Sequence, residues 1–180
     1  MVRDQMTGVK KTVFTAICTA LCVVLPIAFH AFPNGGSVFS PMHIPALLCG
    51  LICGARYGVL CGLLGPLLSS LLTGMPGPVY MPQMMIELAA YGFFTGLLSS
   101  IIHTGNGFAD MMISLVAAMM FGRVIAGISR ALIFARGSYS MSAWIASFFL
   151  NALPGIVMHL VLIPAVVYAL QKAQLIPERY

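Results

Sequence analysis

Charged residues are scarce in this chain of 180 residues, at 7% of the sequence. A soluble globular domain has about 25% charged residues. The shortage is greatest for acidic side chains, of which there are four, against nine Lys and Arg. With a mean hydropathy of +1.00, the chain is not an ordinary soluble domain. We expect no soluble ATPase or large catalytic module within it.

Recognisable catalytic motifs are also missing. The sequence contains no GxSxG, HExxH, CxxC or P-loop pattern and no acidic pair of the DxxD type. We therefore expect a protein that is not an enzyme. No histidine has a second ligand at metal-binding spacing, so neither a metal nor another cofactor is expected. The net charge of +5 needs no nucleic-acid partner, because Lys and Arg are common at the cytoplasmic ends of membrane helices.

Apolar residues make up 60% of the sequence and occur in long runs. Crossing a lipid bilayer takes about 20 mostly apolar residues per helix, which leaves room for about six spans. We expect one membrane domain over residues 1–180, an all-α bundle of six transmembrane helices. Pro66 should interrupt the third of them. The expected helices are Lys10–Phe32, Met42–Gly54 (short for a full span), Tyr57–Leu72, Met84–Ile102, Phe108–Phe134 and Ser142–Lys172.

The distribution of Lys and Arg predicts the orientation. With six spans and a cytoplasmic N-terminus, the outer side holds Arg136 alone. Positive residues favour the cytoplasmic side, so both termini are predicted to be cytoplasmic. The first apolar run continues to Phe32, which favours a retained helix over a cleaved signal peptide. The expected location is a bacterial plasma membrane. The cytoplasmic side would hold Arg3, Lys10, Lys11, Arg56, Lys172 and Arg179.

Five cysteines lie in the apolar stretches: Cys18, Cys22, Cys49, Cys53 and Cys61. The first two and the next two are spaced i,i+4, which puts each pair on one face of a helix. This spacing suits packing better than a disulfide. We expect packing residues, with a thiol redox site or a soft-metal site as the alternative.

Three charges fall inside expected helices: Glu87, Arg123 and Arg130. A charge at membrane depth costs roughly 2.5–3.5 kcal/mol on insertion scales and usually marks a functional site. All three are expected in the outer half, with Glu87 roughly 6–10 Å below the outer end of its helix. Arg123 and Arg130 are spaced i,i+7 and share a face. An arginine fork suits a carboxylate or phosphate; the alternative is an internal Glu–Arg pair that ties helices together.

Five further candidates lie near the outer ends of the expected helices. The aromatic ones could stack on a ring-shaped ligand or belong to the interfacial belt. The amides are better candidates, because a buried amide needs partners. The histidine could contact a ligand or bond the loop backbone, and His159 could be structural or face a partner. With the three charges, the candidates describe a cavity that opens outward. They are Tyr80, Gln83, Trp144, Asn151 and His43.

Small residues recur at four-residue spacing. Ala16 and Ala20 form one such pair, and Gly58 and Gly62 form another. Such pairs let helices approach closely. They serve either packing within the chain or docking to a partner membrane protein.

On these residues the chain resembles the S components of energy-coupling-factor (ECF) vitamin transporters. The pair Ala16-x-x-x-Ala20 is similar to the alanine motif by which S components dock on their coupling subunit. The run Phe39–Gly77 resembles the second and third helices of that family. Residues 86–92 (IELAAYG) resemble its fourth helix, and Asn151–Ile156 (NALPGI) its sixth. The resemblance covers nearly the whole chain.

The resemblance implies a subunit that captures a small vitamin or vitamin precursor from outside. It would associate with a transmembrane coupling subunit and two ATP-binding subunits, and ATP hydrolysis would topple it to release the substrate inward. The vitamin stays open among pantothenate, a pyridoxine-like compound, a pyrimidine precursor, riboflavin, cobalamin and a queuosine precursor. The alternative is a small scaffold or channel, although a channel would need polar residues through its full depth.

Overall fold

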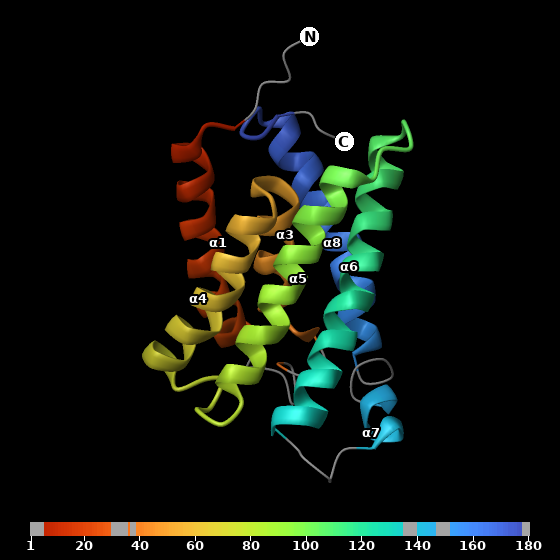
Figure 1. The fold of residues 1–180 in the computed structure, drawn as a ribbon. Helices are drawn as coiled ribbons and strands as arrows, with labels where there is room; N and C mark the ends of the chain where they lie inside the picture. Colours follow the sequence, from red (N-terminus) through yellow and green to blue (C-terminus); the bar gives the residue numbers. More distant parts are fainter. Residues whose placement is uncertain (1–5, 30–35, 37–38, 135–139, 147–151, 178–180) are drawn as a thin grey trace.

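The computed structural model describes residues 6–29, 36, 39–134, 140–146 and 152–177. This part of the chain is helical and contains no strand (Figure 1). Five segments are long and apolar enough to cross a membrane, and α3 is shorter. An all-α membrane fold is therefore confirmed, while the count of six spans stays a prediction. The elements are α1 (Gly8–Phe29), α3 (His43–Cys53), α4 (Ala55–Thr73), α5 (Met81–Ile101), α6 (Gly107–Ser129), the π-helical η1 (Arg130–Phe134), α7 (Met141–Ile145) and α8 (Leu153–Lys172).

The long helices run up and down a single bundle. Helix α5 packs against α3, α4 and α6, and α1 packs against α3 and α4. Helix α1 begins and α8 ends at the same end of the bundle (Figure 1). The two chain ends thus share a side, as expected, and the assignment of that side to the cytoplasm stays a prediction.

Helix α3 is the short interior element of the bundle. All eleven of its residues are buried, and its sequence HIPALLCGLIC is apolar nearly all round, as a helix surrounded by others requires. Gly54 separates α3 from α4 and has a φ of 97°, a conformation that L side chains rarely adopt. One glycine therefore makes the turn between α3 and α4.

Glycines let α4 and α5 touch through their backbones. A Cβ atom added at Gly92 would collide with the backbone of Gly58, and one at Gly62 would collide with the backbone of Leu88. The pair Gly58 and Gly62 thus serves packing within the chain. Small residues have this effect in membrane helices because little else drives their association.

Two helix predictions need correction. Pro66 does not interrupt the third helix, because α4 runs through it from Ala55 to Thr73. The single helix expected over Ser142–Lys172 is replaced by α7 and α8, and Ala152 lies in a turn just before α8. Pro154 lies in the first turn of α8, where its missing N–H costs no helix hydrogen bond. The proline therefore starts the spanning helix instead of kinking it.

Candidate functional site

Four helices bring polar side chains together at one depth. Glu87 in α5, Arg123 in α6 and His159 in α8 each lie six residues, about 9 Å, from one end of their α-helix. In all three helices this is the end away from the chain ends, and α3 begins with His43. The four side chains are buried, with exposures of 8, 5, 2 and 7%, respectively. We call these four residues the polar cluster.

His43 is the centre of the polar cluster. Its Nε2 lies 3.2 Å from Oε1 of Glu87, and its Nδ1 lies 3.2 Å from the carbonyl oxygen of Ser40. Its ring meets the Tyr91 ring edge-on at 4.9 Å and lies nearly parallel to the His159 ring, with centroids 6.0 Å apart. His43 therefore makes the backbone contact expected of a helix-end histidine and contacts the Glu87 carboxyl group as well.

Both ring nitrogens of His43 face an acceptor oxygen. Nδ1 lies beside the Ser40 carbonyl and Nε2 beside the Glu87 carboxyl group, and which nitrogen donates depends on the tautomer of the ring. The contact with Glu87 is an ion pair when the ring is protonated.

Arg123 is held by backbone and ring contacts. Its Nη1 donates to the Met119 carbonyl at 3.4 Å, and its guanidinium carbon lies 5.9 Å from the centroid of the Tyr91 ring. The indole Nε1 of Trp144 donates to the Arg123 carbonyl at 3.3 Å. The Tyr91 ring therefore lies close to both His43 and Arg123.

Sequence reasoning gave His159 no binding role. Its ring is 2% exposed, and neither ring nitrogen has a hydrogen-bond partner in the described part of the chain. The backbone of Phe39 and Ser40 passes nearby without reaching hydrogen-bond geometry. A usable signal was its position five residues after Pro154, because a proline in the first turn marks where the helix starts and so sets the depth of later residues.

The other predicted site residues lie around the polar cluster or farther away. Gln83 is buried in α5, one turn before Glu87, since α5 begins at Met81 and not at Met84. Arg130 is half-buried at the start of η1, and Trp144 is half-buried against Gly127 of α6. Tyr80 is 61% exposed just before α5. Asn151 lies outside the described residues.

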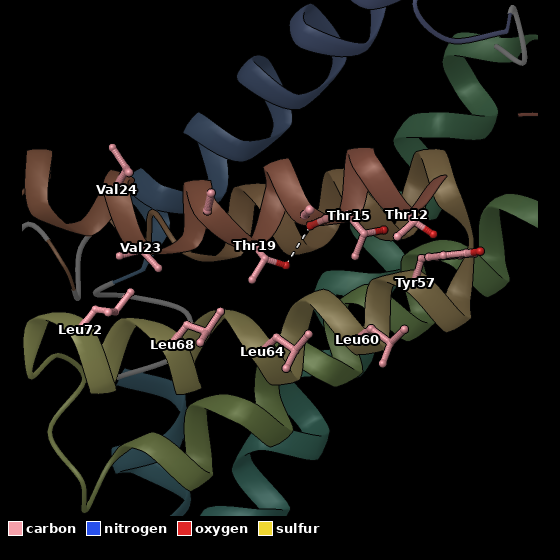
Figure 2. A pocket seen from close by; sticks show the side chains of 12 residues that line it. Thr12, Thr15, Thr19, Val23, Val24, Tyr57, Leu60, Leu64, Leu68 and Leu72 are labelled. Atoms are coloured by element: carbon pink, nitrogen blue, oxygen red, sulfur yellow. Dashed lines mark hydrogen bonds between the residues drawn. The ribbon is translucent and has the colours of Figure 1, made fainter. Parts of the chain in front are cut away.

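A second feature lies on the exposed lateral surface of the bundle, between α1 and α4. Here a groove of about 640 Å³ is lined by Ala16 and Ala20, which are both exposed. Figure 2 shows Leu60, Leu64, Leu68 and Leu72 in a row along α4, facing α1 across this groove. Its remaining lining residues are Thr12, Thr15, Thr19, Val23, Val24 and Tyr57.

Comparisons with known proteins identify the family to which this helical bundle belongs. No curated protein matches the chain. A family model, the ECF transporter substrate-specific component, matches residues 10–167. That match covers most of the helical bundle, including the polar cluster and the groove, and the chain belongs to the family of ECF transporter substrate-specific components.

Proposed function

We propose that this protein binds a small vitamin or vitamin precursor with high affinity and carries it across a bacterial plasma membrane. It works as the substrate-specific subunit of an ATP-driven importer. Its family supports the transporter role, and the polar cluster supports the binding of a small polar molecule.

The polar cluster is the observation that carries the proposal. A charged side chain at membrane depth is costly, so such residues usually face a substrate path or a partner. In this bundle Glu87 and Arg123 are buried together with two histidines contributed by separate helices. A structural contact between His43 and Glu87 alone would not require Arg123 on a third helix. It would not require His159 either, whose ring nitrogens have no hydrogen-bond partner in the described part of the chain.

The other half of the bundle lacks such a cluster in its described residues, and its buried hydroxyls donate within their own helices. Thr95 donates to the Tyr91 carbonyl, and Ser99 donates to the Gly96 carbonyl. Local bonds of this kind do not make a polar path between helices. The arrangement favours a site at one depth over a continuous channel.

The groove supports the partner assignment. Exposed alanines at positions 16 and 20 allow close approach of a helix from another protein, and the leucine row on α4 offers an apolar wall. We assign this groove to the transmembrane coupling subunit, which would in turn carry two ATP-binding subunits. In this proposal the chain spans the membrane six times, with α3 as the short second span and both termini in the cytoplasm.

Native mass spectrometry of the detergent-purified protein tests the binding proposal. The expected result is a bound mass that matches a vitamin or a vitamin precursor. Co-expression with an ECF coupling subunit and its ATP-binding subunits tests the importer, and the expected result is one complex that contains all of them. A chain without a bound molecule, unshifted in thermal stability by any B vitamin and absent from the complex, would overturn the proposal.

A further inference from the structure

His159 is buried in α8 although neither of its ring nitrogens is used. The side chain is 2% exposed, and Nδ1 and Nε2 both lack a hydrogen-bond partner in the described part of the chain. Val157 and Val161 on the same helix are 56 and 67% exposed, so His159 belongs to the side of α8 that faces the bundle interior. Ionisable side chains are rare inside membrane helices, and those that face the interior usually have a function.

The position of His159 favours a role in binding. It lies six residues into α8, at the depth of Glu87 in α5 and Arg123 in α6. Its ring is nearly parallel to the ring of His43, and the two centroids are 6.0 Å apart. A small molecule held by the polar cluster therefore lies within reach of the His159 ring.

A purely structural role does not account for this imidazole. A histidine that ties helices together does so through a hydrogen bond, and His159 makes none within the described residues. Helix α8 packs against α3 and α6, and a leucine could fill the same interior position. A leucine would avoid the cost of burying polar atoms without partners. The sequence thus carries a side chain that destabilises the empty protein.

The ring defines the kind of group that could satisfy it. A neutral imidazole has one donor and one acceptor. A hydroxyl, an amide or a heterocyclic ring nitrogen can bond to one of them and brings no further charge to membrane depth, where each charge is costly. A ligand with such a group removes a cost that the empty protein bears, so the bond contributes to affinity.

We propose that His159 is a substrate-binding residue, and that its ring hydrogen-bonds to an uncharged polar group of the transported molecule. The inference rests on the proposed function, because it concerns the substrate of that same site. His159 lowers the stability of the empty protein and raises its affinity for the substrate. A structural histidine would have the opposite effect on stability.

A leucine at position 159 tests both effects on the detergent-purified full chain. The compounds are pantothenate, pyridoxine, riboflavin, cobalamin, 4-amino-5-hydroxymethyl-2-methylpyrimidine and 7-aminomethyl-7-deazaguanine. Thermal shift identifies the compound that binds, and titration calorimetry measures its affinity. His159→Leu should weaken binding roughly 10-fold or more. The empty variant should unfold at the same temperature as the unmodified protein, or at a higher one.

Two further variants assign the effect to the hydrogen bond. His159→Gln keeps a donor and an acceptor and should bind more tightly than His159→Leu. The matched control is Gln171→Leu, because Nε2 of Gln171 is also buried without a partner in the described part of the chain. Gln171 lies on the same helix, twelve residues or about 18 Å farther toward the chain ends, so its substitution should leave the affinity unchanged.

Several results would overturn the role of His159. They are unchanged affinity in His159→Leu, an empty His159→Leu variant that is clearly less stable or does not fold, and equal affinities in His159→Leu and His159→Gln. An equal loss of affinity in Gln171→Leu would do the same. If the protein purifies with a bound molecule, native mass spectrometry compares the occupancy of these variants.

The same measurements separate this inference from the proposed function. An unmodified chain that binds one of the compounds as tightly as His159→Leu does would overturn the inference and leave the transport function standing. An unmodified chain that binds none of them and purifies empty would overturn both.

Discussion

Glu87 demonstrates why a membrane charge is hard to interpret from the sequence. Its partner in the structure is His43, 44 residues away in the sequence, whereas the sequence suggested an arginine. Opposite formal charge made the arginines attractive candidates, but the contact depends on where α3 starts. Because α3 is a short interior helix whose first residue is His43, the imidazole reaches the carboxyl group from inside the bundle.

The pair of His43 and Glu87 predicts different stabilities for two variants. Glu87→Gln can keep a hydrogen bond to Nε2 of His43, because the amide donates to a neutral ring. Glu87→Ala leaves that nitrogen buried without a partner, which costs roughly 1–3 kcal/mol. In detergent, the Ala variant should unfold at a clearly lower temperature than the Gln variant. Equal losses would mean that the hydrogen bond does not contribute to stability.

A larger residue in place of Gly92 should disturb the packing between α4 and α5. An added Cβ atom would collide with the backbone of Gly58, which cannot move aside as a side chain can. Gly92→Ala should therefore lower the free energy of unfolding by roughly 1–3 kcal/mol. The control is Gly77→Ala, since a Cβ atom at Gly77 meets nothing within 4 Å. Similar midpoints of thermal unfolding for the two variants would contradict this account.

The elements differ in how well the sequence predicts them. Helices α4 and α5 were predicted to within three residues at either end, because Gly and Pro mark their ends. The prediction of a single helix over the region of α7 and α8 was wrong, since apolar composition alone cannot distinguish a kink from a break near Pro154. The site showed the same contrast. Glu87 and Arg123 were found by their charge, whereas His159 was missed because its depth depends on the start of α8 at Leu153 and its neighbour His43 comes from α3.

Substitutions on α1 should separate substrate binding from transport. Replacing Ala16 and Ala20 by Leu fills the groove between α1 and α4 without changing the polar cluster. We expect substrate binding by the purified protein to persist, and assembly with the coupling subunit and uptake by cells to be lost. Calorimetry, copurification and uptake of labelled substrate measure these three effects.

A matched substitution outside the groove is the control for α1. Ala28 is exposed on the same helix and is not among the residues that line the groove. Ala28→Leu should leave assembly and uptake intact. Loss of substrate binding in the doubly substituted chain, with assembly preserved, would contradict the assignment of the groove to the coupling subunit.

At the scale of the whole molecule, the polar cluster and the groove, to which we assign functions in our proposal, lie in different places. The polar cluster lies inside, in the half of the bundle away from the chain ends, whereas the groove lies on the outer surface along α1 and α4. A bound substrate and a docked coupling subunit can therefore occupy the protein together. This arrangement suits a subunit that captures its substrate first and is moved by its partner afterwards.

The orientation of the bundle can be tested by cysteine labelling in cells. All five native cysteines are 4% exposed or less, so a membrane-impermeant maleimide should react little with the unmodified chain. Val79 lies at the end of the bundle opposite to the chain ends, and His103 lies at the same end as the chain ends. Lys and Arg gather at the latter end, which the positive-inside rule places in the cytoplasm. Val79→Cys should therefore be labelled in intact cells, and His103→Cys only after permeabilisation; the reverse result would invert the proposed orientation and put the polar cluster on the cytoplasmic side.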